Sequence, residues 1–408
     1  MGNINTPKIR FPDFKGDWIN NSLGEIAKFS KGKGISKEDI SESGETECIR
    51  YGELYTTYNE TIDTVFSKTN LDTSDLVLSE ANDIIIPASG ETQIDIAKAS
   101  CVLKSGIALG GDLNIIKSPN NGVFLSYYLN SKKKIDIAQL AQGISVVHLY
   151  AGQLSKLQLR IPSLPEQQKI ASFFTAIDQR IFQLKRKKTL LEEYKKGVMQ
   201  KIFSQEIRFK DDNGQEFPKW EKKRLSEIFI EINETVGTRD IPTYSITAGV
   251  GFVSQNEKFG RNISGQQNKH YTVINEGQFS YNKGNSKTYT YGCIYVNDTG
   301  KRIAVPNVFI SFEFIDQKMS SQFYSKLFES HYLDKGLRKI ISSSARMDGL
   351  LNVNKNSFFQ LSVHCPNYIE QQKIGHFLYS IDSKIFHIKK QIERAEVWKK
   401  GLMQQMFV

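Results

Sequence analysis

Residues 166–203 read EQQKIASFFTAIDQRIFQLKRKKTLLEEYKKGVMQKIF, and residues 370–407 read EQQKIGHFLYSIDSKIFHIKKQIERAEVWKKGLMQQMF. The two stretches align without a gap at a constant offset of 204 residues and are identical at 18 of 38 positions. A match of this length requires a duplication, and a duplicated segment defines the architecture before any other feature does. The chain therefore consists of two copies of one plan.

Both copies have the pattern of a single long amphipathic helix, because apolar residues recur at steps of three, four or seven. Ser163 precedes Glu166 by three residues and Asn367 precedes Glu370 by three, which predicts a capping box at each helix start. At about 1.5 Å per residue such a helix is roughly 57 Å long. Domains at its ends could address DNA sites about one turn, or about 34 Å, apart.

A lone apolar stripe must be buried, and the most economical partner is the other copy, in a parallel or antiparallel coiled coil. A glycine inside a helix costs roughly 1 kcal/mol relative to alanine, so its repetition at Gly197 and Gly401 indicates close approach of the helices; the alternative is shared ancestry without function. The residues expected in helix pairing or partner docking are Ile170, Phe173, Ile177, Ile181, Leu184, Gly197, Ile374, Phe377, Ile381, Ile385, Ile388 and Gly401.

A segment with strand-like runs and turn residues precedes each helix. The two segments begin alike, at an offset of 202 residues, and end alike, but are otherwise dissimilar; the matching positions are Trp18, Leu23, Glu25, Ile26 and Pro162 against Trp220, Leu225, Glu227, Ile228 and Pro366. We predict an α+β fold with two mixed α/β domains, each followed by a long helix, and pseudo-twofold pairing of the helices. The expected boundaries are 1–163 with a tail at 1–17, 164–205, 206–366 and 367–408.

The net charge of +10 is a weak guide to function. Residues 164–203 hold nine basic and four acidic residues, and residues 368–407 hold seven and four, so the rest of the chain is nearly neutral. DNA binding and a solvated basic helix face explain this equally well. The four cysteines form no closely spaced pair, which favours a reducing compartment, and no apolar run is long enough for a membrane span. A cytoplasmic location without membrane contact is expected.

Motifs that carry enzyme chemistry are missing. The ten prolines include no Pro-Pro pair of the kind expected in a methyltransferase target-base motif, and KGKGIS at 31–36 lacks the spacing of a phosphate-binding loop. The six histidines show no metal-ligand spacing. We therefore expect neither a catalytic centre nor a metal site in this chain.

The repeated EQQKI helices, the half-and-half layout and the variable domains resemble the specificity subunit of Type I restriction-modification systems over essentially the whole chain. The resemblance implies that each variable domain is a target recognition domain reading one half of a split duplex DNA sequence. It also implies docking of two methyltransferase subunits, which use S-adenosylmethionine, and of restriction subunits, which use ATP and Mg. No cofactor is then expected on this chain itself.

Base edges are read by Arg, Lys, Asn, Gln and small hydroxyl side chains, and phosphates by Lys, Arg and backbone N–H groups. For each candidate the alternative is an ordinary solvated loop residue. The DNA-contact candidates are Lys31, Lys33, Ser89, Glu91, Thr92, Gln93, Gln142 and Ser145 in the first domain, and Tyr281, Asn282, Lys283, Asn285, Lys287, Ser344 and Arg346 in the second.

Two other functions compete with DNA recognition by an inactive subunit. One is an enzyme fragment or hidden nuclease of a fused restriction system, which would methylate or cut DNA without other proteins. The other is a coiled-coil scaffold or single-stranded nucleic-acid binder, which would leave no duplex footprint in two blocks.

Overall fold

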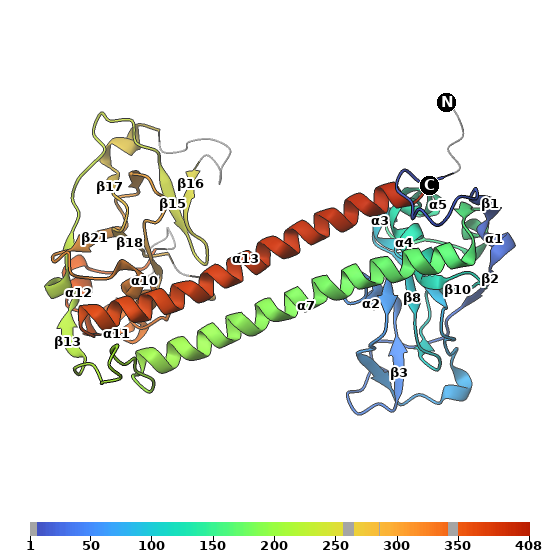
Figure 1. Cartoon of the computed structure of the whole chain (residues 1–408), viewed down its shortest axis with the longest axis horizontal. Coiled ribbons are helices and arrows are strands. Elements are labelled where there is room, and N and C mark those ends of the chain that lie inside the picture. Colours follow the sequence, from blue (N-terminus) through green and yellow to red (C-terminus); the bar gives the residue numbers. More distant parts are fainter. Residues whose placement is uncertain (1–5, 256–264, 285, 342–349) are drawn as a thin grey trace. The chain divides into compact units, whose positions relative to one another are not determined.

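The computed structural model describes residues 6–255, 265–284, 286–341 and 350–408, with the backbone alone at 265–267 (Figure 1). The chain divides into two compact units, the first made of 1–185 with 390–408 and the second of 186–389. Each unit holds one domain and parts of both long helices, α7 (Leu164–Phe203) and α13 (Tyr368–Met406). The predicted α+β architecture with two long helices is thus confirmed.

A five-stranded sheet forms the centre of the first domain, in the order β2 (Lys28–Lys31), β10 (Leu113–Lys117), β6 (Ile84–Pro87), β8 (Ser100–Val102) and β4 (Thr61–Ile62). Neighbouring strands are antiparallel except for β4, which runs parallel to β8. β6 is buried along its whole length because its apolar run IIIP lies between two other strands.

Shorter elements surround this sheet. The strands are β5 (Ser67–Thr69), β3 (Thr46–Ile49) and β9 (Ala108–Leu109) in one sheet, and β7 (Ser89–Gly90) with β11 (Val147–His148) in another. The helices are α2 (Tyr51–Thr56), η1 (Thr73–Asp75), α3 (Gln93–Ile96), α4 (Gly122–Ser131), α5 (Lys134–Leu140) and α6 (Ala151–Leu154).

The second domain has a four-stranded antiparallel sheet in the order β14 (Phe229–Glu231), β21 (Ile310–Phe314), β18 (Phe279–Asn282) and β19 (Cys293–Val296). Two further strand pairs join β15 (Tyr244–Thr247) to β16 (Gly251–Ser254) and β17 (Thr272–Ile274) to β20 (Ile303–Val305). The helical elements are η2 (Gly265–His270), α10 (Ser321–Glu329), α11 (Asp334–Ile340) and α12 (Lys355–Phe359).

Each domain is closed by pairing of its first and last strands. β1 (Ile19–Ser22) runs antiparallel to β12 (Gln158–Ile161), and β13 (Glu221–Arg224) runs antiparallel to β22 (Ser362–Cys365). A one-turn helix follows the first strand in both cases, α1 (Leu23–Ile26) and α8 (Leu225–Ile228). The matching starts and ends in the sequence therefore mark a shared closure of the two domains.

The glutamate at the start of each long helix anchors a preceding tail. The Arg10 guanidinium donates to both carboxylate oxygens of Glu166 at 2.7 Å, and the Trp18 indole donates to the same carboxylate at 3.3 Å. Glu370 accepts from Arg208 and Trp220 in the same manner. The predicted role of the glutamate side chain in a capping box is thus wrong. An arginine side chain offers a buried carboxylate stronger hydrogen bonds than one backbone N–H does.

The cap at the second helix nevertheless uses the predicted residue, since Asn367 Oδ1 accepts the backbone N–H of Glu370 at 2.9 Å. The next residue of each helix bonds the domain. Gln167 Nε2 donates to the Pro162 carbonyl, and Gln371 Nε2 donates to the Pro366 carbonyl, both at 2.9 Å. The EQQ sequence therefore fixes each helix to the domain that precedes it.

The two long helices pack antiparallel within each unit. In the first unit, Asp178 is paired with Lys399, whereas Lys185, farther along α7, is paired with Glu396, which lies earlier in α13. In the second unit the matching contact joins Lys195 to Asp382. Most predicted stripe residues are buried, whereas Phe173, Phe377 and Ile385 are half-buried. The fully buried aromatic at this level of α7 is Phe174, one residue beyond the predicted position.

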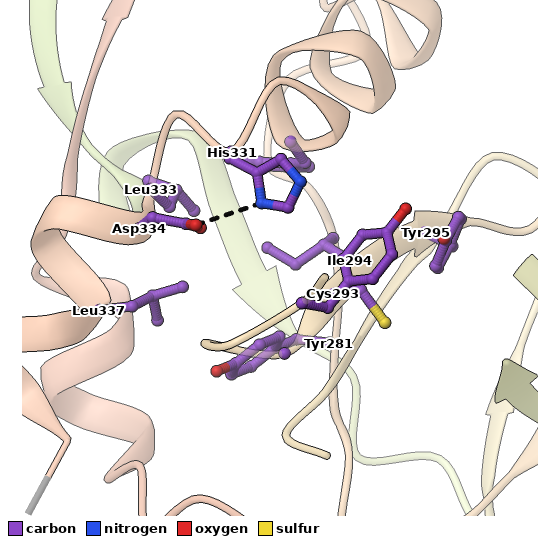
Figure 2. Close-up of a pocket in the computed structure, with 11 residues that line it drawn as sticks. Tyr281, Cys293, Ile294, Tyr295, His331, Leu333, Asp334 and Leu337 are labelled. Carbon is purple, nitrogen blue, oxygen red and sulfur yellow. Dashed lines mark hydrogen bonds and ion pairs between the residues drawn. The ribbon is translucent and has the colours of Figure 1, made fainter. Parts of the chain in front are cut away.

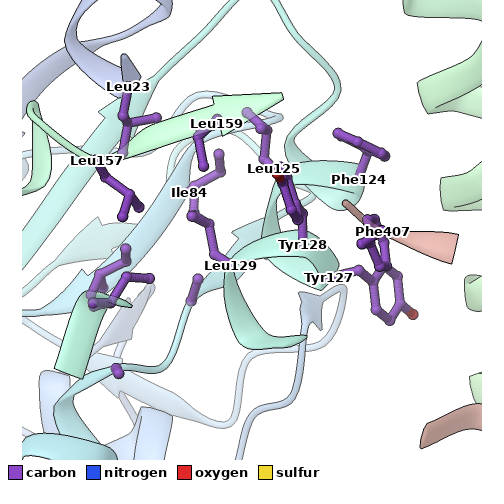
Figure 3. Packing of buried hydrophobic residues seen from close by; sticks show 14 of the residues in the cluster. Leu23, Ile84, Phe124, Leu125, Tyr127, Tyr128, Leu129, Leu157, Leu159 and Phe407 are labelled. Atoms are coloured by element: carbon purple, nitrogen blue, oxygen red, sulfur yellow. The ribbon is translucent and has the colours of Figure 1, made fainter. Parts of the chain in front are cut away.

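The C-terminal ends of the helices complete the domain cores. Met403, Met406 and Phe407 belong to the core of the first unit, where Phe407 lies beside Phe124 and Tyr128 (Figure 3). The equivalent residues 204 positions earlier, Met199, Ile202 and Phe203, belong to the core of the second unit. Each domain core thus incorporates the last turns of the helix that follows the other domain in sequence.

The repeated glycines Gly197 and Gly401 do not mark a close approach. A Cβ atom at either position would meet no described atom within 4 Å, so the expected helix contact is wrong there. Among the glycines of α7 and α13, the crowded one is Gly375, where a Cβ atom would lie 2.9 Å from the Phe323 backbone nitrogen. Gly375 therefore lets α10 pack directly on the backbone of α13.

Candidate nucleic-acid interface

The structure brings two candidate segments of the first domain together. β7 pairs with β11 so that Ser89 lies opposite His148 and Gly90 opposite Val147. The loop between α5 and β11 is closed by two backbone hydrogen bonds, from Gln142 N to His148 O at 2.9 Å and from His148 N to Gln142 O at 2.7 Å. Residues 89–93 and 142–145 therefore form one surface, although about 50 residues separate them in the sequence.

The predicted DNA-contact residues that are exposed on this surface are Glu91, Thr92, Gln93, Gln142 and Ser145. Thr92 Oγ1 caps α3 by accepting the Asp95 backbone N–H at 3.1 Å, and Gln93 Nε2 donates to the Ala141 carbonyl at 3.3 Å. These bonds hold the loops in place and leave other donor and acceptor sites directed to solvent.

Ser89 requires a correction. Its side chain is buried, and its carbonyl accepts the Tyr55 hydroxyl at 2.6 Å. Ser89 therefore supports the surface through its backbone, because its hydroxyl is enclosed and does not reach solvent.

The two candidate lysines point to different neighbours. Lys31 Nζ lies 5.8 Å from the centroid of the Tyr150 ring, which stacks on His148. Lys33 Nζ instead lies 3.6 Å from Asp75. The structure thus joins Lys31 to the surface and adds Tyr150 and His148, which sequence reasoning missed; their alternation with buried Val147 and Leu149 was the available signal.

In the second domain the described candidate residues before position 290 lie at the end of β18 and in the loop that follows it. Gly284 forms a β-bridge with Leu350, and Leu351 N donates to the Lys283 carbonyl at 2.9 Å. The end of β18 therefore contacts the segment after α11. In the first domain β7, which follows β6, contacts the segment after α5 in the same way. Lys287 is exposed on this loop. Asn282 organises it by accepting from Gly284 N at 2.9 Å.

Tyr281 also requires a correction. It is fully buried, its ring stacks on Phe358 at 5.1 Å, and its hydroxyl donates to the Tyr291 carbonyl at 2.7 Å. Burial raises the pKa of this hydroxyl. Tyr281 therefore belongs to the core and does not face DNA. Asn285, Ser344 and Arg346 lie outside the described residues.

A small hollow adjoins Tyr281 in the second domain (Figure 2). His331 Nδ1 lies 3.1 Å from Asp334 Oδ2 at its wall, and burial raises the pKa of Asp334 despite this neighbour. Its volume of about 20 Å³ matches one water molecule. The hollow is therefore too small for a nucleobase or an organic cofactor.

Each unit contains a half-buried ion cluster between the helices and the domain. Lys399 Nζ lies 2.8 Å from Asp178 and 3.1 Å from Glu60, and Tyr127 donates to Asp178 at 2.5 Å. Burial alone lowers the pKa of Lys399, but the two carboxylates outweigh it and raise the pKa above 10.5.

In the second unit Lys195 pairs with Asp382 and with Glu329 of α10. Lys195 and Asp382 are the repeat equivalents of Lys399 and Asp178. The repeated KKG sequence thus marks an ion pair formed by its first lysine, and not the helix contact predicted for its glycine.

The outer faces of the helices carry exposed aromatic residues at repeat-equivalent positions. Phe182 corresponds to Phe386, and Tyr194 corresponds to Trp398; all four are more than half exposed. The first unit presents Phe182 with Trp398, and the second presents Phe386 with Tyr194. The predicted stripe residues are used mainly within the protein, so exposed aromatic residues such as these are the candidates for contact with a partner.

Within the described ranges, no group of three or more His, Cys, Asp or Glu side chains could hold a metal ion. Across the same residues, no helix combines the length and apolar character needed to cross a membrane.

Comparison with known proteins agrees with this architecture. Residues 15–193 match the family model of the Type I restriction modification DNA specificity domain. The chain is 24% identical over 420 residues to the Type I restriction enzyme MjaVIII specificity subunit of Methanocaldococcus jannaschii, covering 97% of this chain and 92% of that protein. Over nearly its whole length the chain is thus similar to a specificity subunit of a Type I restriction-modification system.

Solved structures show the same fold. The S subunit of the Type I restriction-modification system from M. genitalium superposes with a TM-score of 0.61 at 17% identity, covering 99% of both chains. A second chain, from a study of complex assembly and conformational transition of the Type I system, gives a TM-score of 0.51 at 14% identity, covering 95% of this chain and 96% of that one.

Proposed function

We propose that this chain reads a split, asymmetric duplex DNA sequence, one half with each domain, and holds methyltransferase and restriction subunits on its helices. The observation that carries the proposal is the equivalent placement of the candidate loops. In both units the loop after a central strand contacts the segment after a short helix, yet the two loops differ in sequence. Equivalent placement with unlike side chains suits two reading surfaces with different specificities.

The helices supply the attachment sites in this proposal. The aromatic pairs Phe182 with Trp398 and Phe386 with Tyr194 give each unit a similar exposed apolar surface. Two similar surfaces suit two copies of one methyltransferase subunit, because repeated surfaces bind repeated partners. Methylation with S-adenosylmethionine and DNA cleavage with ATP and Mg are then performed by the partners, and this chain binds none of these cofactors.

The proposal is tested by mapping methylated adenines in cells that express this chain with its methyltransferase subunit. We expect one split motif with a constant gap. Insertion of seven residues, about two helical turns, after both Thr189 and its repeat equivalent Glu393 preserves the helix register and should lengthen the gap alone. Exchange of residues 23–157 for another domain should change one half of the motif alone.

Two results would contradict the proposal. One is methylation at a single uninterrupted motif, and the other is DNA cleavage or methylation by the purified chain without partners. Docking is tested separately by Trp398→Ala with Phe386→Ala, which should weaken methyltransferase binding, while Phe66→Ala, at another exposed ring of the first domain, should not.

A further inference from the structure

The most exposed large apolar side chain of the first domain lies at the tip of its candidate interface. Ile144 is fully exposed, and Val146 beside it is about half exposed. Single exposed apolar residues are common on protein surfaces, so exposure alone carries little weight. The position of Ile144 within a constrained loop gives it significance.

The backbone holds this tip in one shape. Gly143 has φ of +130°, and a Cβ atom there would lie 2.0 Å from the Val146 carbonyl oxygen, so only glycine fits. The hydrogen bonds in both directions between Gln142 and His148 close the loop at its base. The loop therefore presents Ile144 on a narrow, two-stranded support.

Polar and basic groups border this apolar tip. They are Gln93, which is bonded to the Ala141 carbonyl, and the stack of His148 on Tyr150 with Lys31 over the same ring. These side chains suit base edges and phosphates. A protein partner would instead favour a broader apolar patch.

A two-stranded support of this kind fits the DNA major groove, which is about 12 Å wide. The apolar group that a base pair presents in that groove is the C5-methyl of thymine. We propose that Ile144 reads DNA by contact with a thymine methyl group in the half-site bound by the first domain. This inference rests on the proposed function and names a specificity-determining residue that no hydrogen-bonding pattern would reveal.

The test uses the complex of the full chain with its methyltransferase partner and a duplex containing the mapped methylation site. Each thymine is replaced in turn by deoxyuridine, which removes only the methyl group, and the Kd is measured. For the wild-type chain we expect one replacement to weaken binding about fourfold, the value of one buried methyl-sized group.

The Ile144→Ala variant should bind the original duplex about fourfold more weakly and should lose its sensitivity to that one replacement. Ile19→Ala, at another exposed isoleucine in β1, should behave as wild type. The inference is overturned if Ile144→Ala binds as tightly as wild type or stays sensitive at the same thymine. A wild-type complex with no preference for any split site would instead contradict the proposed function.

Discussion

The ring of Phe407 stacks on the ring of Tyr128, with centroids 5.4 Å apart and planes 8° apart. Phe407 follows the end of α13, whereas Tyr128 lies in α4 of the first domain. Phe203, its repeat equivalent, meets Phe323 of α10 in the second unit at 5.9 Å. An aromatic contact, stacked in the first unit and edge-on in the second, thus attaches a helix end to each domain.

Removal of the Phe407 ring or of the Phe203 ring should destabilise the unit whose core contains it. Phe407→Ala is expected to lower the free energy of unfolding of the first unit by about 3–5 kcal/mol, because it leaves a cavity in a packed core. Phe203→Ala should do the same in the second unit. Urea unfolding followed by hydrogen exchange would assign the loss to one unit. Trp398→Ala, at an exposed ring, serves as the control, and equal losses for Phe407 and Trp398 would contradict the interpretation.

Stability should depend on pH through Lys399. Its raised pKa means that the folded chain binds this proton more tightly than the unfolded chain does. The resulting stabilisation is complete below pH 10.5, the ordinary pKa, and decreases as pH rises toward the pKa of the folded chain.

The measurement compares the unfolding free energies of wild type and Lys399→Met from neutral pH to about pH 11. Their difference should shrink at alkaline pH. Lys196→Met, at an exposed lysine of α7, serves as the matched control. A Lys399→Met difference that stays constant would refute the assignment.

Glycine substitutions should separate Gly375 from the repeated glycines. Gly375→Leu is expected to destabilise the second unit by about 1–3 kcal/mol, because the side chain would meet the backbone of α10. Gly401→Ala should instead stabilise α13 by up to about 1 kcal/mol, since open space surrounds that position. Thermal unfolding of both variants distinguishes the two positions, and destabilisation by Gly401→Ala would argue for a contact there after all.

DNA binding should distinguish the exposed candidate Lys287 from the buried candidate Tyr281. Lys287→Ala is expected to weaken binding of the mapped site and to reduce the slope of log K against log salt by about one. Tyr281→Phe should leave DNA affinity unchanged but lower stability by about 1 kcal/mol, through loss of one buried hydrogen bond. Lys222→Ala, at an exposed lysine of β13, should retain the wild-type slope.

The duplication, the long helices and the matching starts and ends of the two domains could be predicted because they repeat, whereas the strand pairing that closes each domain could not. The constant offset of 204 residues pairs Glu166 with Glu370 and Lys195 with Lys399. In the structure the two members of each pair make equivalent contacts. The chemical role of each position was harder to predict, since an S-x-x-E spacing also fits a capping box, and the arginine that binds Glu166 lies 156 residues away.

The candidate interface was only partly predictable. Loop composition indicated Gln93 and Gln142, and the structure brings their segments together. Residue type alone does not reveal burial: Tyr281 alternates with polar neighbours, which favours a surface position, yet its ring fills the core. The exposed aromatic residues of the helices do not break the helical spacing of apolar residues, so the sequence does not single them out. They can be recognised as exposed only once the structure shows which residues are buried.

The pairing of β1 with β12, and of β13 with β22, places the two ends of each domain on neighbouring strands. Genetic exchange can therefore replace everything between those strands with a segment of another length, while the anchors Glu166 and Glu370 stay in place. If each domain reads one half of a split site, as proposed, recombination of one such segment would change that half of the target in a single event and leave the helices unaltered.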